Sequence, residues 1–237
     1  MNVNQEETLM YLLARPTLND AQQAQAATLC HEKMDWHSFY ERSGKQGVAC
    51  LMYQHLRNLS IQESIPPDIR EKFDNLYYAN SVRNTLYWEE AKKVVQGLNA
   101  QAIKTIMLKG IFLADKIYNN IAVRPITDID ILCKRKEVLR ANTILNSLGY
   151  VSPPCFRDPY LESRISSINT FIYVNPQNNF FVHLHWHLVN STWPLEFLVQ
   201  KIDMDNICAH AEPAFLDDVV TFTLSLSHLL IYLAHHN

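Results

Sequence analysis

Hydrophobic spacing divides the chain into helical and alternating regions. Residues 1–98 carry Leu, Tyr and Phe three and four positions apart, which predicts helices almost throughout. Pro66-Pro67-Asp68 interrupts this pattern, because proline cannot continue a helix but can begin the next one. Residues 84–98 predict a further long amphipathic segment.

The hydrophobic period changes after this segment. Residues 103–108 (IKTIML) predict a short strand, residues 111–118 about two turns of helix, and residues 126–133 (ITDIDILC) a half-buried strand. Residues 134–148 predict a helix that ends at Gly149, as helices commonly do. This region therefore mixes short strands with helices.

Two more strands and a helical ending follow. Residues 168–174 and 180–188 predict strands, and the polar residues 175–179 between them predict a hairpin turn. Residues 195–237 predict two helical pieces. The longest apolar run, 222–234, is about half to two-thirds of a membrane span and includes serine and histidine, so we interpret it as a buried helix and expect no membrane partner.

Composition narrows the function classes. The chain is 48% hydrophobic and 19% charged, which excludes global disorder, and its five glycines argue against an all-β sandwich. A net charge of -3 provides no strong field for general nucleic-acid binding. Five cysteines without a C-x-x-C pair, and acidic residues where a signal peptide has basic ones, predict reduced thiols in a cytoplasmic protein.

Asp128 and Asp130 are the first candidates for chemistry. In a strand, residues i and i+2 project from one face, about 6 to 7 Å apart. Two carboxylates so placed repel each other unless a cation lies beside them, and oxygen ligands suit Mg²⁺. Taken alone, so short a pattern favours the simpler interpretation of two solvated aspartates.

The residues around the aspartates change that balance. Lys109 and Gly110 lie where a strand leads into a helix, a position at which backbone N–H groups can bind a phosphate. Arg124 lies on the loop before Asp128 and would reach the same pocket. Each of these residues, taken singly, fits a turn glycine or a surface charge; together with the two aspartates they form a constellation instead of a lone motif.

Four blocks of sequence resemble a known family, the uncharacterised nucleotidyltransferases of the polymerase-beta-like superfamily. The order and spacing of the blocks are similar to the family's, and the similarity covers about residues 98–190. The blocks are IMLKGIFLADKIY (106–118), RPITDIDIL (124–132), LGY (148–150) and VHLHW (182–186).

The resemblance implies an α+β fold. A small mixed β-sheet nucleotidyltransferase core is expected at residues 99–190, between a helical N-terminal domain at residues 1–98 and a helical C-terminal extension at residues 191–237. Family members usually continue with further helices, so we expect a chain that is either short for the family or truncated at its end.

The resemblance also implies an activity: metal-dependent transfer of a nucleoside monophosphate from ATP or another NTP to a hydroxyl group. Asp128 and Asp130 would bind Mg²⁺ or Mn²⁺, and Lys109 and Gly110 would bind the nucleotide phosphates. Arg124 is a candidate for bidentate contact with the β- and γ-phosphates. The acceptor, whether a small molecule, a protein or an RNA, is not identified by the sequence, and neither is the oligomeric state.

His183 departs from the family pattern. The third carboxylate of the superfamily usually lies at this position, and no Asp or Glu occurs between Glu162 and Glu196. An imidazole can bind a metal, but it suits Mn²⁺ or another transition metal better than Mg²⁺ and cannot act as a carboxylate base. The resemblance therefore leaves two alternatives: an enzyme with weakened activity, or a catalytically degenerate protein that binds a nucleotide or a partner.

The histidines offer a third alternative. His183, His185 and His187 share one strand face, where they could bind a transition metal, although three positions along one strand are too far apart for a single ion to collect easily. HLHWHLV also resembles the signature of histidine-triad nucleotide hydrolases and transferases, in which His185 would be the nucleophile. The glycine-rich segment that precedes that signature is absent.

Overall fold

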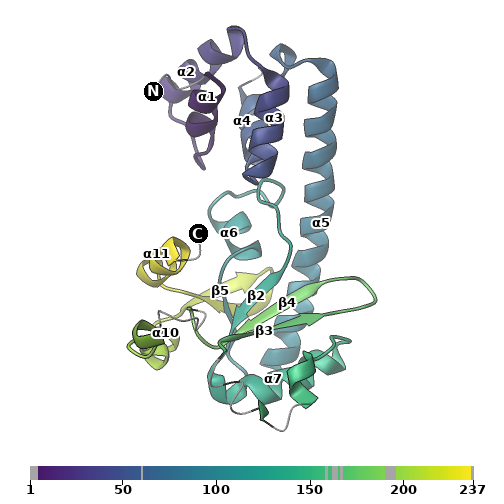
Figure 1. The fold of residues 1–237 in the computed structure, drawn as a ribbon, viewed down its shortest axis with the longest axis vertical. Coiled ribbons are helices and arrows are strands. Elements are labelled where there is room, and N and C mark those ends of the chain that lie inside the picture. The colour runs from purple at the N-terminus through teal and green to yellow at the C-terminus, as the bar shows by residue number, and fades with distance from the viewer. Residues whose placement is uncertain are drawn as a thin grey trace. The chain divides into compact units, whose positions relative to one another are not determined.

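The computed structural model divides the chain into two compact units (Figure 1). The first unit comprises Met1–Leu86 and Leu113–Ile126, and the second comprises Tyr87–Phe112 and Thr127–Asn237. The structure describes residues 5–59, 61–157, 160–161, 165, 168–189 and 196–235.

The first unit is built from helices with well-defined ends. Asn19 begins α2 with a capping box in which its side chain and that of Gln22 each bond the other's backbone N–H, and Asp35 caps α3 through the N–H of Ser38. The helices are α1 (Gln5–Leu13), α2 (Asp20–His31), α3 (Trp36–Lys45), α4 (Ala49–Asn58), the 3-10 turn η1 (Gln62–Ser64) and the part of α5 (Pro67–Asn99) up to residue 86.

Buried apolar side chains from these helices form one core. Tyr53 of α4 stacks on Phe73 of α5 with ring centroids 5.0 Å apart, and Phe39 of α3 packs beside them. The predicted helical N-terminal region is therefore confirmed. As the proline pattern indicates, α5 begins at Pro67.

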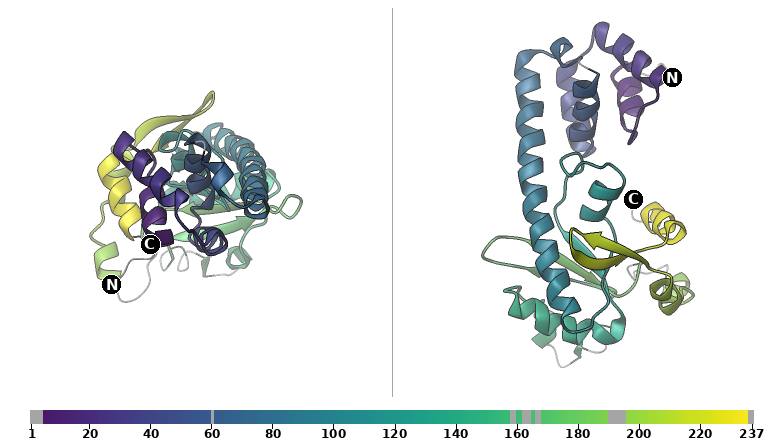
Figure 2. Two further views of the ribbon diagram at one scale, coloured as in Figure 1. Left: turned by 90° about the horizontal axis from the view of Figure 1, so that it is seen from above. Right: turned by 180° about the vertical axis from the view of Figure 1, so that it is seen from behind.

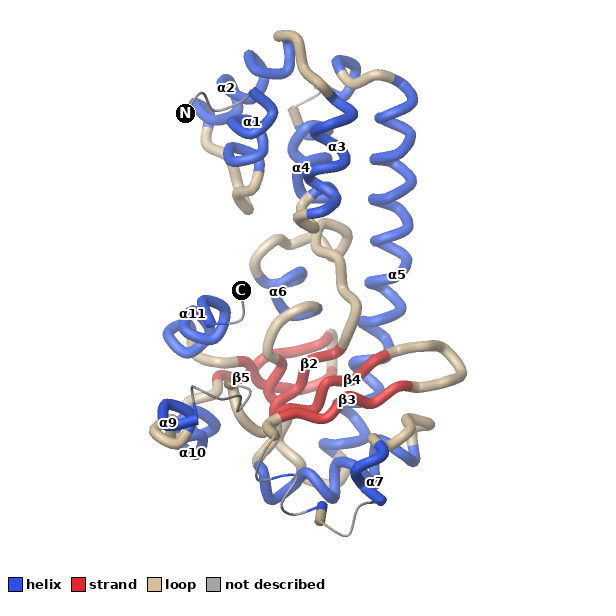
Figure 3. The backbone as a smooth tube through the Cα atoms, viewed as in Figure 1, coloured by secondary structure: helices blue, strands red, loops and turns tan. Residues whose placement is uncertain are grey.

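The second unit contains a six-stranded mixed sheet (Figure 3). Its strands are β1 (Ile106–Met107), β2 (Ile129–Leu132), β3 (Thr170–Val174), β4 (Phe181–His185), β5 (Glu212–Leu216) and β6 (Val219–Thr223). Their spatial order is β3-β4-β2-β1-β6-β5. β2 is parallel to β4 and antiparallel to β1, β1 is parallel to β6, and the hairpins β3–β4 and β5–β6 form the two edges.

The second unit also contains helices. The last turns of α5 and helix α7 lie side by side (Figures 1 and 2), and Gly97 permits this contact, since a Cβ there would lie 3.1 Å from Leu148 and 3.3 Å from Ile144. The remaining elements are η2 (Arg135–Glu137), α7 (Val138–Ser147), η3 (Pro154–Arg157), α9 (Glu196–Val199), α10 (Met204–Ala209) and α11 (Leu226–His235); α6 (Ile111–Lys116) is divided between the units.

The mixed α+β fold is confirmed, with two corrections to the sequence-based prediction. Residues 212–223 are not helical: Asp217 adopts a φ of 54°, and a two-residue turn joins β5 to β6. β2 is not half-buried: all four of its residues, Ile129–Leu132, are buried, and because successive side chains point to opposite faces, both faces of the strand are covered. Among the described residues, no helix is both long and apolar enough to cross a membrane.

Candidate active site

The candidate site lies where two parallel neighbours of the sheet, β2 and β4, carry their polar residues. Asp130 of β2 is directly opposite His183 of β4, and two positions further along Leu132 is opposite His185. Asp128 immediately precedes β2, and the hydroxyl of Tyr87 donates a hydrogen bond of 2.6 Å to the carbonyl of Thr127 at the entry to this strand. Polar side chains from two adjacent strands therefore lie side by side on one face of the sheet.

His183 lies within reach of both aspartates. Its Nδ1 atom is 3.3 Å from Oδ2 of Asp128 and 3.7 Å from Oδ1 of Asp130. His185 is closer to Asp130, with Nε2 at 3.0 Å from Oδ1. The two carboxylates therefore share one side of the strand, and imidazoles occupy the space next to them.

Lys109 and Gly110 belong to the same cluster. Nζ of Lys109 lies 3.5 Å from Oδ2 of Asp130. Gly110 adopts a φ of 61°, a conformation that favours glycine, and a Cβ at this position would lie 3.6 Å from the carbonyl oxygen of Asp128. The strand-to-helix corner thus packs against the backbone that carries the aspartates.

Burial and charge set the protonation of these groups. Burial raises the pKa of Asp128, and the charge of Asp130 raises it further. Burial alone would also raise the pKa of Asp130, but the hydrogen bond with His185 and the charge of Lys109 hold it below its ordinary value. Burial lowers the pKa of His183 despite the two carboxylates beside it. The arrangement favours an ionised Asp130 next to an uncharged His183.

His187 does not join the cluster, and Arg124 belongs to the other unit. His187 follows β4, and its ring nitrogens lie 3.1 Å from the carbonyl oxygen of Val189 and 3.2 Å from that of Val199. Arg124 belongs to the helical unit, where its backbone carbonyl accepts a hydrogen bond of 2.7 Å from Asn84, and its role in phosphate binding stays a prediction.

A family model described as an uncharacterised nucleotidyltransferase matches residues 32–237. The chain belongs to this family. No curated protein and no solved structure matches the chain. Family membership supports nucleotidyl transfer as the general activity and a nucleotide as a substrate, and it leaves the acceptor and the metal open.

This member of the nucleotidyltransferase family carries a group of side chains suited to a metal ion. One ligand atom from each of Asp130, His183 and His185 lies within 4.8 Å of the other two. Oδ2 of Asp130 is buried and has no hydrogen-bond partner among the described residues, which leaves a lone pair available beyond the contact with Lys109. Two imidazoles and a carboxylate are donors that transition metals accept readily.

Two residues near the aspartates, His185 and Tyr232, are not indicated by the aspartate pair or by the Lys109-Gly110 corner. His185, not His187, joins the group of side chains that could hold a metal ion, because β4 ends at His185 and the next residues leave the strand. Tyr232 of α11 is buried, and burial, followed by the charges of Asp130 and Asp128, raises the pKa of its phenol. No sequence signal connects Tyr232 to the aspartates, since it lies in an apolar run about 100 residues away.

Proposed function

We propose that this protein transfers a nucleoside monophosphate from an NTP to a hydroxyl group of an acceptor. A divalent metal would bind at the cluster formed by Asp128, Asp130, His183 and His185. The observation that carries the proposal is the juxtaposition of Asp130 with His183 and His185 from the adjacent parallel strand. Asp128 adds a second carboxylate 3.3 Å from Nδ1 of His183. Family membership provides the reaction class to which this geometry is applied.

The donor set supports Mn²⁺ or another transition metal in preference to Mg²⁺. Mg²⁺ prefers oxygen ligands, and only the two aspartates offer them in this cluster, whereas imidazole nitrogen suits transition metals. Such an ion, when bound, would stabilise negative charge on a triphosphate and lower the pKa of an attacking hydroxyl. His183 and His185 would hold the ion through their ring nitrogens, and the buried Asp130 would supply a fixed negative charge beside it.

The other predicted residues act on the phosphates. Lys109, whose ammonium group lies 3.5 Å from Asp130, would pair with the triphosphate, and the backbone at Gly110 would allow it to approach. Arg124 remains the candidate for the β- and γ-phosphates. The acceptor is a small molecule, a protein or an RNA; the net charge of -3 does not support general nucleic-acid binding. The cytoplasm is the proposed compartment.

Calorimetric titration with a non-hydrolysable ATP analogue tests the site. The wild-type protein is expected to bind the analogue more tightly with Mn²⁺ than with Mg²⁺, and more tightly with either than with EDTA. The Asp128→Asn/Asp130→Asn variant should lose the metal-dependent part. The Asp20→Asn/Asp68→Asn variant, which removes two exposed carboxylates from helix starts, is the matched control. Metal-dependent binding that survives in the Asp128/Asp130 variant would contradict the proposal.

A second candidate is a catalytically degenerate protein that binds a nucleotide without a metal. Lys109 lies beside Oδ2 of Asp130 and His183 lies beside Asp128, so nitrogen groups already neighbour both carboxylates. This candidate predicts unchanged nucleotide binding in EDTA and no release of pyrophosphate. Activity gained in a His183→Asp variant of an inert wild-type protein would support it; ordinary transferase rates in the wild type would exclude it.

The geometry gives the histidine-triad alternative less support. Nε2 of His185 lies 3.0 Å from Oδ1 of Asp130, and the side chain is only 6% exposed, so the nitrogen is engaged and shielded. A metal-independent phosphoramidate hydrolysis abolished by His185→Ala would restore that alternative.

A further inference from the structure

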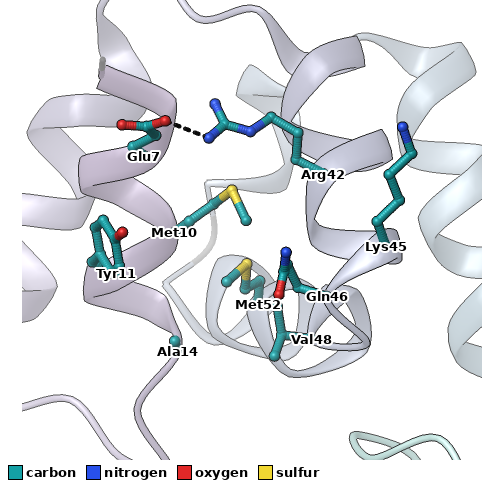
Figure 4. Close-up of a pocket in the computed structure, with 9 residues that line it drawn as sticks. All are labelled: Glu7, Met10, Tyr11, Ala14, Arg42, Lys45, Gln46, Val48 and Met52. Carbon is teal, nitrogen blue, oxygen red and sulfur yellow. Dashed lines mark hydrogen bonds and ion pairs between the residues drawn. The ribbon is translucent and has the colours of Figure 1, made fainter. Parts of the chain in front are cut away.

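The helical unit contains a pocket of about 400 Å³ between α1, α3 and α4 (Figure 4). All of its lining residues lie within residues 1–86, so the pocket belongs to one unit. The volume is within the range of sites that bind small organic molecules. Part of the lining comes from α1, which precedes the segment matched by the family model, and the family's description assigns the pocket no role.

The floor of the pocket is apolar. Met10 of α1 and Met52 of α4 extend toward its middle, and Val48 lies beside them (Figure 4). Met52 is only 1% exposed, which ties this floor to the core of the unit. Methionine side chains adapt to the shape of a bound group, so the floor suits an apolar body without demanding one outline.

One side of the pocket is cationic. Arg42 and Lys45 lie one turn apart on α3, and Arg42 Nη2 is 2.5 Å from Oε1 of Glu7 on α1. For Lys45, the described part of the chain offers no carboxylate within ion-pair distance. The three charged side chains that line the pocket sum to one positive charge, so an incoming anion would neutralise it.

We infer that this pocket binds a small organic monoanion, a carboxylate joined to an apolar body. In the Glu7–Arg42 pair the guanidinium donates to a carboxylate, and its planar fork has further N–H groups to donate. Lys45 adds a second cation, and the methionine floor receives the apolar part. This binding is independent of the proposed nucleotidyl transfer.

Three small probes separate the contributions of charge and apolar contact. 3-Phenylpropionate has both features, 3-phenylpropanamide has the same shape without the charge, and acetate has the charge without the ring. Calorimetry or NMR titration of the full chain is expected to give the tightest binding for 3-phenylpropionate. The amide should bind about fivefold more weakly, the factor expected for a partly exposed charge pair.

Substitutions at the rim locate the binding. Lys45→Glu should weaken the binding of 3-phenylpropionate about fivefold or more and leave the binding of the amide unchanged. Lys33→Glu is the control: it makes the same charge change at an exposed position outside the pocket lining and should alter the binding of neither probe. Ala14→Trp, at an exposed lining position, should block both aromatic probes, and Ala24→Trp on α2 is its control.

Two results would overturn the inference. One is the absence of 3-phenylpropionate binding to the wild type at tens of millimolar, and the other is binding that Ala14→Trp leaves intact. Both measurements are made without nucleotide or metal, so their outcome is distinguishable from failure of the transferase proposal.

Discussion

Replacing Asn84 by alanine is expected to destabilise the helical unit because this side chain joins α5 to the segment 113–126. Asn84 is fully buried, and its Nδ2 group donates to the carbonyl oxygens of Ile121 and Arg124. One turn earlier, the side chain of Asn80 donates a hydrogen bond of 2.5 Å to the carbonyl oxygen of Ala122. These amides satisfy backbone groups that no helix or strand would otherwise pair.

The size of the effect follows from three contributions. Two hydrogen bonds contribute about 0.5–1.5 kcal/mol each, and the carbonyls left without a donor add to the loss. Alanine is the better helix former and returns about 0.5 kcal/mol. The net expectation is a decrease of about 1–3 kcal/mol in the free energy of unfolding.

Asn75 provides the matched control, since it lies on the same helix, is exposed, and makes no side-chain hydrogen bond among the described residues. Asn75→Ala should stabilise the protein by about 0.5 kcal/mol through helix propensity alone. Urea unfolding monitored by circular dichroism at 222 nm measures both variants. Equal effects of the two substitutions would refute the assigned role of the Asn84 amide.

Three further predictions test other parts of the molecule. Burial raises the pKa of Cys30 from 9.0 to about 12 and that of Cys50 from 9.0 to about 11. The contribution of these two thiols to stability should therefore be fully present below pH 9 and be lost as the pH rises above it. Cys30→Ala should reduce this decline, measured by thermal unfolding. Asn179 has a φ of 57°, so Asn179→Ala should cost about 1 kcal/mol in urea unfolding while Asn179→Gly is nearly neutral. Mn²⁺ should raise the apparent Tm more than Mg²⁺, and His183→Ala should remove the difference.

Local periodicity predicts much of the fold because most elements bury one face. The start of α5 at Pro67 and the β3–β4 hairpin both follow from sequence-local signals, a helix-starting proline and a polar turn. The β5–β6 hairpin was missed because its turn, Asp217-Asp218, lacks the glycine or asparagine that usually marks one. The alternation of VVTFT (219–223) is the signal that could have identified the second strand.

The sequence predicts only part of the candidate site. Spacing places Asp128 and Asp130 on one face, because a strand has a period of two. It does not reveal that β4 lies parallel beside β2 and brings His183 opposite Asp130, since that register depends on contacts more than 50 residues apart in the sequence. The same limit applies to Tyr232, whose proximity to the aspartates arises from the packing of α11.

The position of Lys109 makes metal and nucleotide binding interdependent under the proposed function. Two carboxylates and one ammonium group leave the cluster with one negative charge when the imidazoles of His183 and His185 are both uncharged. A divalent ion bound alone would crowd Lys109 with positive charge, whereas a triphosphate gives the ammonium group a new partner. Each ligand should therefore increase the affinity for the other by the same factor, as linkage requires.

Lys109→Met separates these effects. It should raise the affinity for Mn²⁺ alone, because Asp130 loses a competing cation, and lower the affinity for the ATP analogue in the presence of Mn²⁺. Lys104→Met is the control: this lysine lies in the same unit, but its Nζ contacts the carbonyl of Cys208 and the ring of Phe222, away from the aspartates. If Lys109→Met lowered both affinities, Lys109 would have to support the metal site instead of competing with it, and the charge argument would fail.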